Sequence, residues 1–212
     1  MQEERFPWPW SGPQSRRVAA VGAAWVAFLL AWGLFATTVL PGASASPWPP
    51  DAAGQAPLYA RFDSGWYADI ARDGYGPPPP AGVPSEHAFF PLYPYAARAI
   101  HLATGLGVFR SLLLVSWASF LLSLPLFLEE ARRRRLPAGG WSAVPILLLY
   151  PSAFFLQAAY GDALYLLLAL LAFRSVRRGR LAAAAALGLL AGLCRAPAAA
   201  LGPGLAVAFL FE

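Results

Sequence analysis

The chain has 212 residues, of which 58% are hydrophobic and 13% charged, and its formal net charge is +5. Soluble domains have about 45–50% apolar and about 25% charged residues, so this composition indicates a membrane protein with several spans. All 16 basic residues are arginine, which excludes Walker-type phosphate loops and Schiff-base enzymes, because both need a lysine amine. One cysteine, Cys194, excludes an internal disulfide, and His87 and His101 are too few for a histidine-rich zinc site.

The first apolar segment covers residues 18–40 and contains no charge, so it is long enough to cross a bilayer. Arg16 and Arg17 precede it, which predicts that residues 1–17 are cytoplasmic. A signal peptide that is cleaved after Ala43-Ser44-Ala45 is the alternative. The apolar run is long for a signal peptide and further spans follow, so we expect an uncleaved first span.

A long extracytoplasmic loop is expected over residues 41–110. Its proline-rich runs, 47–50 and 77–80, favour stiff extended spacers. Between them we predict a short amphipathic helix at the membrane surface, with Asp63 or Ser64 as its N-cap and Gly74 as its stop. Residues 96–106 are predicted to form a helix that dips into the membrane without crossing it, because a crossing would put the next arginine cluster outside.

The second half of the chain, residues 111–212, predicts a transmembrane helical region. Residues 111–128 form an uncharged run, and arginine clusters at 132–135 and 174–180 flank the segment that follows it. Arginine clusters favour the cytoplasmic side, so this segment is expected to cross twice, over about 141–158 and 160–176. A second hairpin is expected over about 181–194 and 197–211. The predicted fold class is therefore an all-α polytopic membrane protein, a helical bundle of five or six spans.

This topology collects unusual polar residues at the outer face. Asp162 and Arg195 each interrupt an apolar hairpin, which costs about 2.5–3.5 kcal/mol if the charge lies at mid-helix, so both are functional candidates. Structural alternatives remain open for each: Asp63 as a simple helix cap, Asp162 as a polar turn, and Arg195 as an arginine that reaches the headgroups. The other candidates on this face are Glu86, His87, Arg98 and His101.

Three motifs in this region resemble a known family. They are Arg61-Phe-Asp-Ser-Gly-Trp-Tyr-Ala-Asp-Ile-Ala-Arg-Asp-Gly-Tyr75, then Ala88-Phe-Phe-Pro-Leu-Tyr-Pro94 with Arg98, then Pro151-Ser-Ala-Phe-Phe-Leu156 with Tyr160-Gly-Asp-Ala-Leu-Tyr165. Arg195-Ala-Pro197 is a weaker fourth. In this order they are similar to the motifs of the PIG-V-like mannosyltransferases, which belong to the GT-C superfamily of polytopic glycosyltransferases.

The resemblance implies a GT-C-like bundle that transfers a sugar, expected to be mannose, from a polyprenyl-phosphate donor to a lipid or glycan acceptor. Transfer would occur at the extracytoplasmic face of the cell membrane, with inversion at the anomeric carbon. Asp63 is the expected general base, and Arg98, Arg195 and His101 are expected to bind the donor phosphate. The remaining expected contacts, to the acceptor and the sugar face, come from Glu86, His87, Asp162, Trp66 and Tyr67.

Two further expectations concern completeness and metals. GT-C enzymes usually carry more spans, and this chain ends in mid-pattern, so we expect an N-terminal part or a short form of the family. No cofactor is expected, although a divalent cation among Asp63, Glu86 and His87 is a further option. No nucleic-acid partner is expected. The alternative function is a non-enzymatic polytopic protein that binds or transports a lipid carrier, or an inactive truncated homologue.

Overall fold

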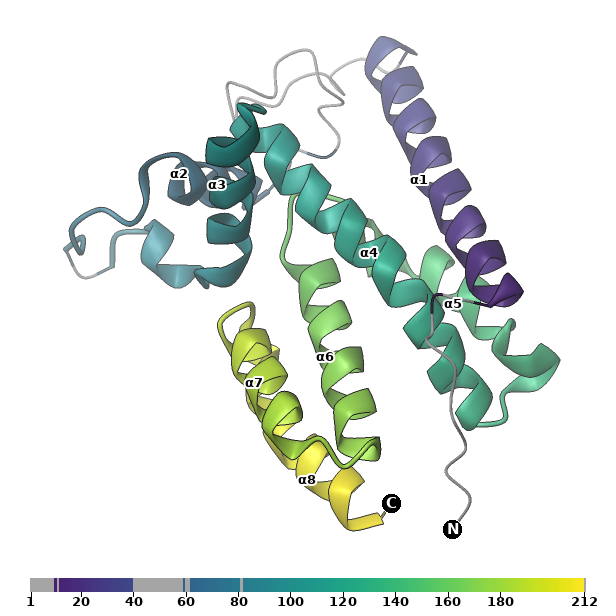
Figure 1. The fold of residues 1–212 in the computed structure, drawn as a ribbon. Helices are drawn as coiled ribbons and strands as arrows, with labels where there is room; N and C mark the ends of the chain where they lie inside the picture. The colour runs from purple at the N-terminus through teal and green to yellow at the C-terminus, as the bar shows by residue number, and fades with distance from the viewer. Residues whose placement is uncertain (1–9, 11, 40–58, 60–61, 81, 212) are drawn as a thin grey trace.

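Figure 1 presents the computed structural model of the chain, which describes residues 10, 12–39, 59, 62–80 and 82–211. These residues form helices joined by turns and loops, with no strand among them, so the all-α fold class is confirmed. The α-helices in chain order are α1 (Pro13–Val39), α2 (Ser64–Asp73), α3 (Leu92–Thr104), α4 (Val108–Arg133), α5 (Ala143–Leu149), α6 (Asp162–Arg177), α7 (Leu181–Gly192) and α8 (Leu201–Phe211). Short 3₁₀ helices accompany them: η3 (Glu86–Ala88), η4 (Pro137–Gly140), η5 (Pro151–Leu156) and η6 (Ala196–Ala200).

Two helices are long and apolar enough to cross a membrane, namely Pro13–Ala36 within α1 and the whole of α4. The later helices are shorter: α6 has 16 residues, α7 has 12 and α8 has 11. A crossing needs about 20 apolar residues, so these three fall below that length. The total of five or six crossings stays a prediction.

Helices α1 and α4 pack through a stripe of small and branched residues on α1. Val18, Gly22 and Val26 are buried, and their spacing of four places them on one helix face. Gly22 permits the closest approach, because a Cβ at this position would meet the side chains of Leu121 and Leu124 on α4. Small residues at such contacts let two backbones approach closely, which is how helices associate in lipid.

Helix α4 is the central helix, and α1, α3 and α6 all pack against it. Buried polar side chains join it to its neighbours. The hydroxyl of Tyr93 on α3 donates to the Leu112 carbonyl at 3.0 Å and lies 2.8 Å from Ser116 Oγ. Ser116 donates in turn to the Tyr160 carbonyl at 3.1 Å, and Trp117 Nε1 donates to the Gln157 carbonyl at 2.8 Å. These bonds hold α3 and the segment 157–161 against α4.

The single helix expected over 141–158 is wrong. The structure has α5 and then η5 in its place, and the chain turns at Tyr150, whose ψ is 137°. Pro151 explains the break, because a residue before proline is pushed out of the helical region and proline itself has no N–H to donate. Four buried or half-buried residues (Gln157, Ala158, Ala159 and Tyr160) then lead without regular helix into α6.

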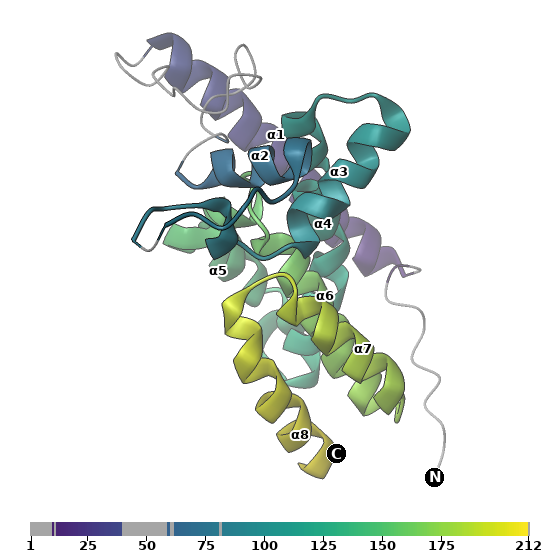
Figure 2. The ribbon, with the colours of Figure 1, turned by 90° about the vertical axis from the view of Figure 1, so that its left-hand side faces the viewer.

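The loop between α1 and α4 carries α2 and α3 packed together, away from the C-terminal end of α8 (Figure 2). The predicted short helix is confirmed as α2, with Asp63 in the N-cap position and Gly74 at the C-cap with φ 86°. The helix expected over 96–106 forms as α3, which begins earlier, at Leu92, and ends where Gly105 adopts a left-handed φ of 72°. Residues 43–45 and the proline run 47–50 lie outside the described residues.

The arginine clusters gather at one end of the bundle. Helices α1 and α4 run in opposite directions, so Arg16 and Arg17 at the start of α1 lie toward the same end as residues 132–135 after α4 (Figure 1). The last turn of α6 joins them, because Arg174 and Arg177 form ion pairs with Glu129 and Glu130 of α4. We call this the arginine end. Arg5 and Arg61 lie outside the described residues.

We expect Gly22→Leu to separate α1 from α4, because the new side chain must enter the space that Leu121 and Leu124 occupy. Overpacking of this kind costs about 2 kcal/mol. Ala23→Leu is the matched control, since Ala23 is the next residue on α1 and is exposed. Thermal unfolding in detergent, followed by tryptophan fluorescence, should give a lower Tm for Gly22→Leu alone. Equal Tm values for the two variants would contradict the contact.

Candidate active site

Four segments that are distant in sequence line one pocket of about 390 Å³, formed by Phe62, Asp63, Phe155, Tyr160, Asp162 and Arg195. We call it the site pocket. Asp63 precedes α2, Phe155 belongs to η5, Asp162 is the first residue of α6, and Arg195 precedes η6. Three of the predicted site residues, Asp63, Asp162 and Arg195, are therefore brought together.

Asp63 enters the pocket from a strained turn. Phe62 before it has a positive φ of 53°, a conformation that is uncommon for a bulky residue. The backbone N–H of Asp63 donates to the Tyr160 hydroxyl at 2.7 Å, which fixes the turn over the pocket. The Asp63 side chain makes no capping hydrogen bond, because its φ of −79° and ψ of 1° differ from the extended geometry of a typical N-cap. Its exposed carboxylate thus serves no cap and is available to a ligand.

Asp162 and Arg195 form an ion pair in the pocket wall. Asp162 occupies the first turn of α6, where the positive end of the helix dipole stabilises a carboxylate. One carboxylate oxygen contacts Arg195 Nη1, whereas the other, Oδ2, is buried and has no hydrogen-bond partner among the described residues. A guanidinium has five N–H donors in a fixed fork, so this pair orients Arg195 and leaves donors for a bound anion.

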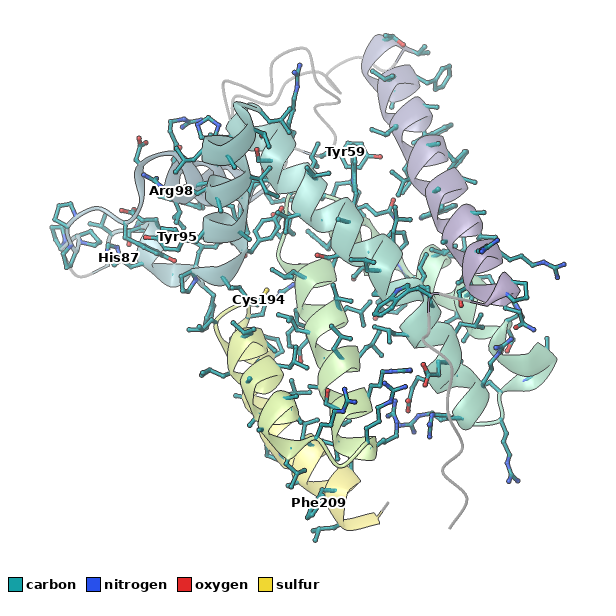
Figure 3. The ribbon with its side chains drawn as sticks, in the orientation of Figure 1. Tyr59, His87, Tyr95, Arg98, Cys194 and Phe209 are labelled. Atoms are coloured by element: carbon teal, nitrogen blue, oxygen red, sulfur yellow. The ribbon has the colours of Figure 1, made fainter. Side chains whose placement is uncertain are left out.

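The turn that carries Arg195 is held by two contacts to other elements. The Leu92 N–H donates to the Leu193 carbonyl at 2.9 Å, and Cys194 Sγ donates to the Gly161 carbonyl at 3.2 Å. Gly161 allows a close approach, because a Cβ there would lie 3.2 Å from Cys194 Sγ and 3.4 Å from Tyr93 Cβ and would press on both. These contacts place Arg195 beside Asp162, the residue that follows Gly161. Figure 3 labels Cys194 at the start of this region.

Tyr160 was missed as a site residue by the sequence analysis, as were Phe62 and Phe155. Burial raises the pKa of Tyr160 to about 12, so its phenol stays protonated at neutral pH. Its oxygen accepts the Asp63 N–H, which ties the Tyr160 hydroxyl to the turn that carries Asp63. Phe155 packs edge-on against the Tyr160 ring, with ring centroids 4.9 Å apart. The sequence signal for Tyr160 was its position two residues before Asp162, in the third motif.

Tyr67 and Trp66 lie behind the pocket rather than in its lining. Tyr67 is buried and makes edge contacts with Phe89, Tyr93 and Tyr160, at centroid distances between 5.1 and 5.8 Å. Burial raises the pKa of Tyr67 well above its ordinary value. Trp66 stacks on Phe89 at 6.0 Å. Tyr67 therefore supports the pocket wall through Tyr160, whereas Trp66 packs on Phe89, and the sugar contact expected of both rings stays a prediction.

Arg98 and His101 do not line the site pocket. Both side chains donate to backbone carbonyls where helices end. Arg98 Nη1 donates to the carbonyls of Ala71 and Arg72 at 3.2 and 2.7 Å, which satisfies the last carbonyls of α2. His101 Nδ1 donates to the Leu106 carbonyl in the turn between α3 and α4. Arg98 therefore holds α2 against α3, and His101 holds the turn that follows α3; Figure 3 labels Arg98 in this position.

Glu86 and His87 also lie outside the pocket lining, in η3 on the far side of α2 and α3. Glu86 Oε1 accepts the Gly76 N–H at 2.8 Å, and this bond, with its own backbone N–H, holds the pKa of Glu86 below its ordinary value. His87 lies near Ser85 Oγ and packs against the Tyr75 ring at 5.6 Å. These contacts close the proline-containing loop 77–85 on itself.

In the part of the chain that the structure describes, no three histidine, cysteine or acidic side chains gather in a way that suits a metal ion. No family model matches the chain, and neither the curated proteins nor the solved structures contain a match. The family resemblance therefore rests on the motifs alone.

We expect Gly161→Ala to displace the turn of Arg195, because the added Cβ enters the contact with Cys194 and Tyr93. The expected loss of stability is about 1–3 kcal/mol. Gly192→Ala is the matched control, since a Cβ at Gly192 meets nothing within 4 Å. Thermal unfolding should separate the two variants. A Gly161→Ala protein as stable as Gly192→Ala would show that the close approach is not required.

Loop 77–85 is expected to open in acid. The folded-state pKa of Glu86 is depressed, so its contact with Gly76 is fully present above the ordinary glutamate pKa and is lost as the pH falls through the depressed value. Hydrogen exchange of the Gly76 amide, corrected for its intrinsic rate, should lose protection at that pH. Glu86→Gln should weaken this protection at neutral pH already. Protection that stays constant with pH would contradict the contact.

Proposed function

We propose that this protein is a membrane glycosyltransferase that moves a sugar, with mannose the expected one, from a polyprenyl-phosphate donor to a hydroxyl acceptor. The observation that carries the proposal is the meeting of Asp63 and Arg195, 132 positions apart, in one pocket. A carboxylate beside a guanidinium is the pair that inverting transfer from a phosphate needs. The motifs that resemble the PIG-V-like family supply the same two residues.

In the proposed reaction Asp63 is the general base. The acceptor oxygen attacks the anomeric carbon, its proton passes to the Asp63 carboxylate, and the bond from that carbon to the phosphate oxygen breaks. The bonding electrons leave with the phosphate, whose negative charge Arg195 stabilises. Tyr160 holds the turn of Asp63 through the Asp63 N–H, and Asp162 keeps the guanidinium of Arg195 in position.

An apolar groove beside the pocket supports a lipid-linked donor. It has a volume of about 320 Å³, and its lining includes Phe127, Ile146, Leu147, Tyr150 and Leu156. Asp162 belongs to the lining of this groove and of the site pocket, so the two are adjacent. We propose that the polyprenyl chain lies in the groove, which would leave the phosphate near Arg195.

The membrane placement is part of the same proposal. We infer that α1 and α4 cross the bilayer and that the shorter apolar helices complete the five or six crossings. The arginine end faces the cytoplasm, since arginine clusters favour that side, and the site pocket then faces the extracytoplasmic side. Arg98 and His101 are not part of the proposed donor site, because neither lines the site pocket: Arg98 donates to the last carbonyls of α2, and His101 donates to the Leu106 carbonyl in the turn after α3.

Sugar transfer from a labelled polyprenyl-phosphate mannose tests the proposal, with membranes that contain the chain and a native lipid extract as acceptor. Asp63→Asn should lower the rate by about 10²–10⁴-fold, because it removes the general base. Asp73→Asn is the matched control, since Asp73 is an exposed acid at the other end of α2. Equal rates for wild type and Asp63→Asn would exclude Asp63 as the base, and no transfer by either would favour the lipid-carrier alternative.

A further inference from the structure

The arginine end holds a network of charges that the proposed sugar transfer does not use. Glu129 on α4 pairs with Arg174 on α6 and lies 3.7 Å from Arg133 on its own helix. Glu130 pairs in the same way with Arg177 at 2.9 Å and with Arg134 at 3.1 Å. Each carboxylate is thus shared between two guanidinium groups, so the network keeps an excess of positive charge.

The excess is greatest at the last turn of α6. The Arg174 side chain is only 7% exposed, and its Nη2 has no hydrogen-bond partner among the described residues. Arg177 and Arg178 lie close enough to repel the charge of Arg174. A buried guanidinium with incomplete pairing is costly, and an additional anion would reduce that cost.

The turn that follows α6 presents further donors. Gly179 adopts a left-handed φ of 65°, and the Arg180 N–H donates to the Ser175 carbonyl at 2.9 Å, so Arg178 and Arg180 belong to one tight turn. Both arginine side chains are exposed. Helix α7 starts at the next residue, Leu181, and the first N–H groups of a helix have no partner within it. Helix N-termini and arginine forks both bind phosphate oxygens.

We propose that the turn 178–180, which follows the helical turn that carries Arg174, binds the phosphate of an anionic phospholipid headgroup. The occupant is a lipid because the neighbouring helices are apolar: the exposed side chains of α7 and α8 include Leu181, Leu189 and Phe209, which suit acyl chains. Arginine clusters next to apolar helices are typical of anionic lipid binding. The inference needs the membrane placement but not the sugar transfer, so the two can fail separately.

The test uses the purified full-length chain in neutral detergent. Native mass spectrometry counts retained lipid during titration with phosphatidylglycerol or phosphatidylcholine, and inorganic phosphate is titrated separately. The site variant is the double substitution Arg178→Gln and Arg180→Gln. The matched control is Arg16→Gln with Arg17→Gln, which removes the same charge from the same end but on α1. Size-exclusion chromatography and Tm confirm that both variants fold.

The wild type should retain phosphatidylglycerol at least fivefold better than phosphatidylcholine. The site variant should need on the order of tenfold more phosphatidylglycerol for the same occupancy, and the control should stay within twofold of wild type. An equal loss of phosphatidylglycerol retention in both double variants would mean that the lipid responds to the overall positive charge of the arginine end, and it would overturn the proposed site. Equal retention of phosphatidylglycerol and phosphatidylcholine would overturn the proposal as well. Displacement of the lipid by millimolar inorganic phosphate would also contradict it, because the site would then bind free anions.

Discussion

The close approach at Gly161 is the constraint on which the pocket depends. Three segments meet at this residue: the start of α6, the Cys194 turn and Tyr93 of α3. Tyr93 is itself bound to α4 through Leu112 and Ser116. The positions of Asp162 and Arg195 are therefore fixed relative to the central helix α4 by buried hydrogen bonds between neutral groups, which do not titrate near neutral pH. The polar side chains of the pocket keep their relative positions because these hydrogen bonds are buried and shielded from water.

Much of the fold follows from apolar run length and from helix signals. The uncharged stretches predicted α1 and α4, and Asp63 with Gly74 predicted the limits of α2. The break at Tyr150 was missed although Pro151 is plainly visible, because a hydropathy count over 141–158 does not weigh the missing N–H of proline. The local backbone chemistry of Pro151 determines where this helix ends, and the average hydropathy of the segment does not.

The candidate site could be predicted only in part. Asp162 and Arg195 stand out in sequence because charges inside apolar runs are rare, and Asp63 stands out through the family-like motif over 61–75. Arg98 carries the same kind of signal, yet its partners are the carbonyls that end α2, and no sequence pattern distinguishes a helix-end contact from a ligand contact. Tyr160 is the opposite case. Its place in the third motif is visible in the sequence, but tyrosine is common at membrane interfaces, so the contact of its hydroxyl with Asp63 emerges only from the fold.

The length of α7 has a consequence for water and lipid around Arg195. Twelve helical residues rise only about 18 Å, whereas the hydrocarbon layer is about 30 Å thick. In the proposed membrane placement, a helix that starts at the arginine end brings its last residues, and the Arg195 guanidinium after them, to a level below the opposite headgroups. A charge at that depth requires either a local thinning of the bilayer or a water-filled depression above the pocket. If the proposed donor is the substrate, either deformation would let its phosphate approach Arg195 while it remains hydrated, so hydrophobic mismatch would guide the donor to this pocket.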